Sequence, residues 1–193
     1  MAITQYSFGK NLAAAASNNV RDIYKEWTAA EVRADLQENR TDLVTILMNV
    51  THDFNKASAI RSNNAFLGKE VYIVGRRKYN TCGDVGMRHY ETVYHADTLQ
   101  ETVDKLHDDG YTVYAVDNQM EYHPVNLWDE DFPRKSAFVF GEEQRGLSQE
   151  EIEMCDKMIY VAMYGSVRSL NVASCATVIM AEYSRRYREV QHE

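Results

Sequence analysis

The sequence predicts an α/β fold, in which a mostly parallel sheet carries helices on both faces. Short apolar segments rich in β-branched residues alternate with segments whose apolar residues recur at helical spacing. The stretches between them are polar and contain most of the 9 glycines. With 193 residues, of which 45% are hydrophobic, the chain is long enough for one globular domain with a small extension.

Residues 1–40 are expected to form a helical N-terminal extension, and residues 41–193 the main domain. The first twenty residues are polar and rich in alanine, whereas apolar residues recur at helical spacing between residues 19 and 39. Thr28 is a candidate N-cap, because Glu31 follows three residues later and completes a capping box.

The main domain is expected to alternate between strand and helix. Five short apolar segments are predicted as strands: 43–50, 71–74, 111–116, 137–140 and 158–161. Helical spacing predicts helices over 54–67 and 170–187. A third helix is predicted between an N-cap at Asp97 and a stop at Gly110, and a short fourth one begins at the capping box of Ser148 and Glu151. The stretches around Gly75, Gly83 and Gly86 and over 117–135 are predicted as irregular connections.

Ligands of parallel sheets bind beyond the carboxyl ends of the strands. The loops that follow Val50, Val116, Phe140 and Val161 are therefore the expected places for a site. Each of these loops except the one after Val116 leads into a predicted helix.

Composition excludes several classes of protein. The net charge of −8 argues against indiscriminate coating of nucleic acid, although a local basic face remains open. No apolar run approaches the ~18 residues that span a bilayer, and the first residues lack a signal-peptide core. The 3 cysteines form no CxxC pair and the 6 histidines have no ligand spacing, so we expect no metal and a cytoplasmic location.

Three segments at predicted strand ends carry the most specific signal: 49–62, 140–148 and 161–176. Taken in this order, they resemble the three motifs of the SpoU/TrmH branch of the SPOUT superfamily. The members of this branch are RNA ribose 2′-O-methyltransferases. The matching residues are Asn55 and Arg61 in the first segment, Gly141, Glu143, Gly146 and Leu147 in the second, and Met163, Gly165, Ser169, Leu170, Asn171 and Val172 in the third. The resemblance covers roughly residues 40–188.

The resemblance implies a reaction, a cofactor and an assembly. Methyl transfer from S-adenosylmethionine to a ribose 2′-OH of structured RNA is expected, with tRNA of the guanosine-18 type as the favoured substrate. The implied catalytic residues are Asn55, Arg61, Glu143, Ser169 and Asn171, and the implied cofactor-binding residues are Val116, Gly141, Val161, Met163 and Leu170. A deep C-terminal trefoil knot and a homodimer are implied by the resemblance alone.

RNA binding requires positive charge, and two stretches supply it. Candidate phosphate contacts are Arg76, Arg77, Lys78, Arg88, Arg185 and Arg186. The cations near the end of the last helix are also what the helix macrodipole alone would favour.

Other interpretations stay open. Singly, Asn55, Ser169 and Asn171 are ordinary helix caps, and Arg61 an ordinary surface arginine. The sequence departs from the family pattern at Ala162, where proline is usual, and at Glu142, where a small residue is usual. The alternatives are a knotted dimer that binds RNA or S-adenosylmethionine without turnover, and a related enzyme that methylates an RNA base or a ribosomal RNA ribose.

Overall fold

The computed structural model describes residues 3–7, 19–48 and 52–187. Its centre is an eight-stranded sheet with the order β1-β4-β3-β2-β7-β5-β8-β6. The strands are β1 (Thr4–Gln5), β2 (Val44–Met48), β3 (Glu70–Val74), β4 (Val93–Ala96), β5 (Thr112–Val116), β6 (Val125–Asn126), β7 (Ser136–Phe140) and β8 (Lys157–Tyr160). All neighbouring strands run parallel except β1 and β4, which are antiparallel, so the predicted mostly parallel sheet is confirmed.

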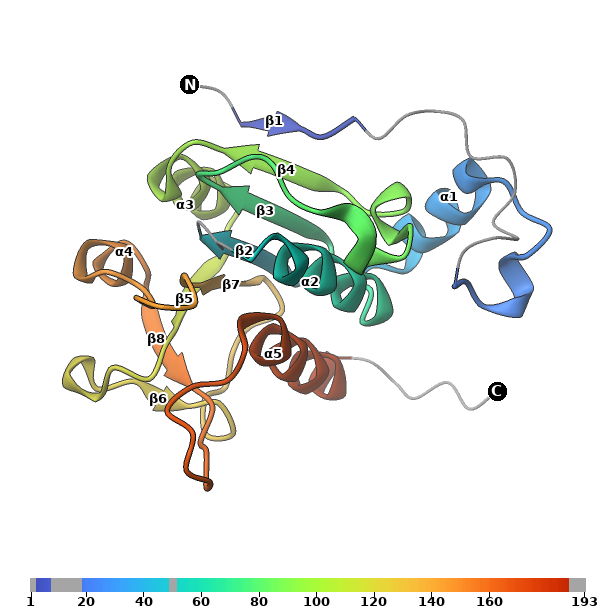
Figure 1. Ribbon diagram of the computed structural model, residues 1–193. Coiled ribbons are helices and arrows are strands. Elements are labelled where there is room, and N and C mark those ends of the chain that lie inside the picture. The colour runs from blue at the N-terminus through green and yellow to red at the C-terminus, as the bar shows by residue number, and fades with distance from the viewer. Residues whose placement is uncertain (1–2, 8–18, 49–51, 188–193) are drawn as a thin grey trace.

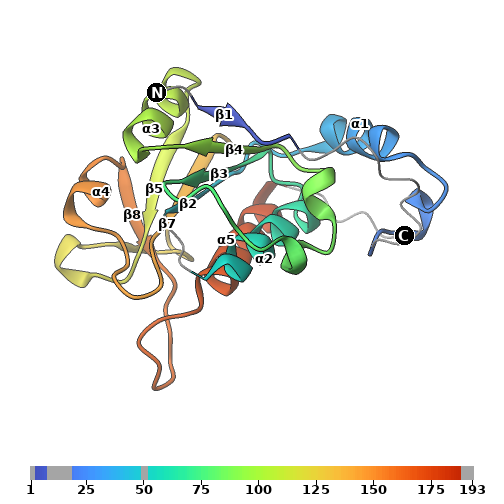
Figure 2. The same cartoon turned by 45° about the horizontal axis from the view of Figure 1, so that its top comes forward.

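Helices cover both faces of this sheet (Figures 1 and 2). They are α1 (Ala29–Asn39), α2 (Asp53–Ala65), α3 (Leu99–Asp108), α4 (Gln149–Glu153) and α5 (Val172–Tyr187). Alternate residues of the central strands enter different cores: Leu47 packs with α2 and α5 on one face, and Ile46 with α3 and α4 on the other. Burial on both faces explains why the central strands are continuously apolar.

Both predicted capping boxes are confirmed. Thr28 and Glu31 bond reciprocally at the start of α1, and Ser148 and Glu151 do so at the start of α4. The N-cap of α3 is Thr98 rather than the predicted Asp97, because the Thr98 side chain accepts from the Glu101 amide.

Two strands lie in stretches that were predicted to be irregular. β4 has four residues, and its third, the buried His95, hides the apolar pattern; the His95 Nε2 donates to the Gly75 carbonyl at 2.7 Å. β6 has only two residues. Segments of this length give too little periodicity for a sequence pattern to reveal them.

The N-terminal extension also differs from the prediction, because it is not only helical. β1 adds an antiparallel strand to the sheet edge beside β4 (Figure 1). α1 packs through Val32 and Leu36 against Met87 and Tyr90 of the main domain. Residues 1–40 therefore share packing and hydrogen bonds with the main domain where they are described.

Candidate active site

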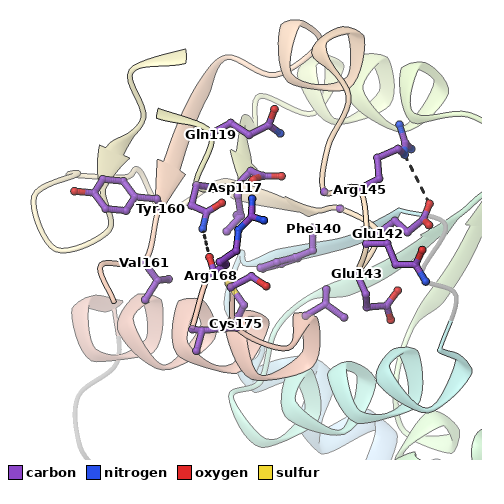
Figure 3. A pocket seen from close by; sticks show the side chains of 18 of the residues that line it. Asp117, Gln119, Phe140, Glu142, Glu143, Arg145, Tyr160, Val161, Arg168 and Cys175 are labelled. Carbon is purple, nitrogen blue, oxygen red and sulfur yellow. Dashed lines mark hydrogen bonds and ion pairs between the residues drawn. The ribbon is translucent and has the colours of Figure 1, made fainter. Parts of the chain in front are cut away.

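A pocket of about 530 Å³ opens at the carboxyl ends of β5, β7 and β8 (Figure 3). Its walls come from three loops, over residues 116–119, 140–146 and 160–170, and from the start of α5. These are three of the four loops that the sequence indicated. The fourth, after Val50, begins in residues 49–51, which lie outside the described residues.

Every residue predicted to bind the cofactor lines this pocket: Val116, Gly141, Val161, Met163 and Leu170. The pocket volume lies within the ~300–1,000 Å³ of small-molecule sites. Two further predicted residues, Glu143 and Ser169, also line it.

The loop after β7 is folded back on itself, and two glycines make this possible. A Cβ on Gly141 would lie 2.4 Å from the carbonyl carbon of Gly146, so no larger residue fits. Gly146 has a φ of 71°, and its neighbour Leu147 donates its amide to Asp117 Oδ2 at 2.8 Å. The absence of a side chain at Gly141 therefore lets the two ends of this loop approach each other closely.

Three of the five predicted catalytic residues form one chain of hydrogen bonds. Asn171 Nδ2 donates to Asn55 Oδ1 at 3.1 Å, and Asn55 Nδ2 donates to Glu143 Oε1 at 2.7 Å. Each residue belongs to a different motif and a different element. The chain therefore joins the start of α2, the loop after β7 and the start of α5 at one edge of the pocket.

The other two predicted catalytic residues do not join this chain. Arg61 is exposed on α2 and makes no hydrogen bond or ion pair with a residue that the structure describes. Its six-residue offset from Asn55 turns it away from the face that meets Glu143. Ser169 is exposed at the pocket, where the carbonyl of its neighbour Arg168 accepts from Asn118 Nδ2 at 2.6 Å.

The predicted phosphate contacts fall into two groups. Arg76, Arg77 and Lys78 are exposed, and Arg185 is exposed while paired with Glu182. Arg88 is different, because its guanidinium contacts the buried Asp84 at 2.7 Å.

Arg186 requires a correction. Its side chain is only 14% exposed, bonds to Glu182 and the carbonyls of Leu127 and Glu130, and stacks over Phe132. These contacts enclose the guanidinium, so Arg186 serves internal packing rather than contact with a phosphate.

Several pocket residues were missed by the sequence reasoning. They are polar or charged and come mainly from the loops after β5 and β7: Asp117, Asn118, Gln119, Gln144, Arg145 and Arg168. Their position directly after predicted strands was the available signal, since ligands bind at strand ends. Arg168 lay within the third motif-like segment but matched no motif position.

Charges of both signs meet in the pocket. Glu142, the unusual carboxylate of the second segment, lies 3.7 Å from Arg145 (Figure 3). Arg145 also contacts Glu151 at 3.1 Å. Glu142 is thus partly neutralised. Burial raises the pKa of the Cys175 thiol to about 12, so this pocket residue is an uncharged thiol at neutral pH.

Neither a metal-binding cluster nor a membrane-spanning helix is present among the described residues. They contain no group of three or more His, Cys, Asp or Glu side chains that could hold a metal ion. Within the same residues, no helix has the length and apolar character needed to cross a bilayer.

Comparison with known proteins now assigns the family. The model of the SpoU rRNA Methylase family matches residues 42–181. A tRNA (guanosine(18)-2′-O)-methyltransferase of Thermus thermophilus is 29% identical over 155 residues, which are 78% of either chain. Its namesake from Aquifex aeolicus is 25% identical over 162 residues, covering 82% of this chain and 76% of its own.

Solved structures agree with the sequence comparison. The crystal structure of the A. aeolicus TrmH/SpoU tRNA modifying enzyme has a TM-score of 0.72 at 25% identity, covering 82% of this chain and 81% of that one. The SpoU methyltransferase AviRb from Streptomyces viridochromogenes has a TM-score of 0.69 at 24% identity, covering 76% of this chain and 60% of its own. From its three motifs, its fold and these matches, the chain belongs to the SpoU rRNA methylase family.

Proposed function

We propose that the protein transfers a methyl group from S-adenosylmethionine to a ribose 2′-OH of tRNA, at guanosine 18. The observation that carries this proposal is the Asn171–Asn55–Glu143 hydrogen-bond chain, which unites all three motifs beside the pocket. The relatives from T. thermophilus and A. aeolicus, named for this reaction, support the choice of tRNA and of guanosine 18.

The pocket residues fit S-adenosylmethionine. This molecule carries a sulfonium, an ammonium and a carboxylate, and the pocket offers the carboxylates of Asp117 and Glu142 and the guanidiniums of Arg145 and Arg168. Val116, Val161 and Leu170 add apolar surface for a purine ring. When bound there, the cofactor supplies an activated methyl group.

The protein's own task is to position the ribose hydroxyl and to accommodate its negative charge. Asn55 has a fixed amide orientation, because its Oδ1 accepts from Asn171 and its Nδ2 donates to Glu143. Such preorganised polar groups need no rearrangement during the reaction. Arg61 is a permanent cation with an open guanidinium, suited to bind an RNA phosphate or to stabilise a developing alkoxide.

The proposal includes a homodimer and a C-terminal knot, both as the family resemblance implies. A groove of about 380 Å³ runs between α2 and α5 and is lined mostly by small residues, including Ser58, Ala173 and Ser174. Phe54, at its end, is 58% exposed. A second copy packed on this face would cover Phe54 and bring its own residues toward Arg61.

We further propose a cytoplasmic location. All three cysteines are free thiols, as a reducing compartment would leave them.

The test is methyl transfer from radiolabelled S-adenosylmethionine to unmodified tRNA, followed by digestion to nucleosides. Label in a 2′-O-methylnucleoside is expected. Label in a base would establish the base-methylating alternative. Ribosomal RNA is assayed in parallel, and label in that RNA alone would make it the substrate in place of tRNA. Cofactor binding without transfer to either RNA would favour the non-catalytic dimer.

A further inference from the structure

The segment that follows β3, residues 75–78, combines exposed charge with a tightly held backbone. We call it the basic segment. The side chains of Arg76, Arg77 and Lys78 are all exposed. In contrast, all four of its carbonyl oxygens accept hydrogen bonds from side chains of other elements.

Two of the donors come from the main domain. Lys56 of α2 is fully buried, and its Nζ donates to the carbonyls of Arg76 at 2.9 Å and Lys78 at 3.5 Å. His95 of β4 donates to the carbonyl of Gly75. Since Lys56 directly follows Asn55, the basic segment is bonded to the helical turn that contributes to the candidate active site.

The remaining donor comes from the N-terminal extension. The hydroxyl of Tyr6, the residue after β1, donates to the Arg77 carbonyl at 2.5 Å. The ring of Tyr6 lies 5.2 Å from the Arg77 guanidinium and makes an edge contact with Tyr79. The Tyr6 amide in turn donates to Val93 of β4 at 2.9 Å, so the sheet edge fixes this tyrosine.

The chemistry of the basic segment suits an RNA phosphate. Arginine and lysine side chains bind phosphate oxygens, and a backbone that is already ordered loses less entropy on binding. Burial raises the pKa of Tyr6 to about 12, so its hydroxyl stays protonated as a donor at neutral pH. A tyrosine that only filled space would not need its hydroxyl directed at this carbonyl.

We propose that Tyr6 is a positioning residue that holds the basic segment in the geometry for binding an RNA backbone phosphate. The proposal rests on the proposed function, because it takes RNA as the substrate. It assigns a role to the N-terminal strand: β1 brings Tyr6 to the Arg77 carbonyl, while Lys56 and His95 bond the other three carbonyls of the segment.

The test compares Tyr6→Phe with the matched control Tyr122→Phe, which removes a hydroxyl beyond β5, away from the basic segment. Binding of an unmodified tRNA transcript is measured by fluorescence anisotropy, alongside steady-state kinetics and cofactor binding. Losing one hydrogen bond of a preorganised segment is expected to raise the Kd and KM for tRNA about threefold to tenfold. The kcat of Tyr6→Phe and its Kd for S-adenosylmethionine are expected to stay within about twofold of the parent values. For Tyr122→Phe, the tRNA Kd and KM are also expected to stay within about twofold.

A second variant, Arg77→Gln, tests the phosphate contact itself. Removing one cation that binds a phosphate is expected to lower the slope of log Kd against log salt concentration by about one. An unchanged tRNA Kd and KM in Tyr6→Phe, or an unchanged salt slope in Arg77→Gln, would overturn the inference. Because binding is measured without turnover, a parent protein that binds tRNA but does not methylate it would contradict the proposed function alone.

Discussion

Asn171 uses the two ends of one amide for two different purposes. Its Oδ1 accepts from the amides of Ala173 at 2.9 Å and Ser174 at 3.3 Å, and so caps α5. Its Nδ2 donates to Asn55 Oδ1. From the sequence alone, Asn171 could be either a helix cap or a site residue. The structure is compatible with both roles at once.

Two substitutions at this position separate the purposes. Asn171→Asp keeps the cap acceptor, and a carboxylate is favourable at a helix N-terminus, so stability is expected within about 0.5 kcal/mol of the parent. The donor to Asn55 is lost, and we expect turnover to fall about tenfold or more. Asn171→Ala removes both the donor to Asn55 and the cap acceptor, so it is expected to lose about 1 kcal/mol of stability in addition to the turnover. Urea unfolding and methyl transfer are the measurements; parent-level turnover in Asn171→Asp would remove the hydrogen-bond chain from the mechanism.

Arg61 is expected to act on the transition state rather than on the cofactor. Replacing it with alanine removes a permanent cation, and turnover is expected to fall roughly 10²-fold while cofactor affinity stays near the parent value. Arg61→Lys keeps the charge without the planar fork and is expected to recover only part of the rate. Single-turnover kinetics and calorimetric cofactor titration measure these effects. An alanine variant with undiminished turnover would exclude Arg61 from the reaction.

At the scale of elements, the sequence predicts what depends on local pattern. The continuous apolar strands and both capping boxes are confirmed because each is encoded by neighbouring residues, and three of the four predicted site loops line the pocket. β1 and β6 escape prediction because two-residue strands have no period, and β4 because His95 interrupts its pattern. Asp117 and Arg145 lie in loops that the sequence indicated, but no motif marks either residue, so their place in the pocket lining became visible only in the fold.

α5 holds an ion-pair cluster that should make stability depend on pH. Hydrogen bonds from Arg185 and Arg186 hold the pKa of the nearly buried Glu182 below its usual range. A lowered folded-state pKa contributes stability above the unfolded-state value, and this contribution is lost as pH falls through the folded-state pKa.

Glu182→Gln should therefore flatten the acid side of the stability profile. As pH falls from neutral to below about 4, through the lowered folded-state pKa, the parent is expected to lose more stability than the variant. Urea unfolding across this range measures both, with Glu121→Gln, at an exposed carboxylate, as the matched control. Parallel profiles for the parent and Glu182→Gln would show that Glu182 does not carry the dependence.

At the scale of the whole molecule, the face formed by α2 and α5 carries both the open Arg61 and the exposed Phe54. The two helices lie side by side in both views (Figures 1 and 2). One chain contributes 22.3 kDa, so light scattering is expected to give a homodimer of twice this mass. A parent protein with the mass of one chain would contradict the dimer.

Phe54→Glu places a charge on the proposed contact and is expected to give monomers with little activity.

A dimer raises the further question of which copy supplies Arg61. If Arg61 acts on the partner's site, exchanging subunits between the impaired Arg61→Ala and Asn171→Ala proteins raises activity above that of either variant, because one site of each mixed dimer is intact. If it acts within its own chain, the mixture is no more active than the two variants assayed separately. Either result shows whether Arg61 serves the site of its own chain or that of the partner.

Site-specific methylation is decided by two tRNA transcripts that differ in one atom. The parent protein is incubated with radiolabelled S-adenosylmethionine and either an unmodified transcript or one with 2′-deoxyguanosine at position 18. We predict label in 2′-O-methylguanosine from the first transcript and none from the second, since only the second lacks the accepting hydroxyl. Equal label in both transcripts, or label in a base, would contradict ribose methylation at guanosine 18.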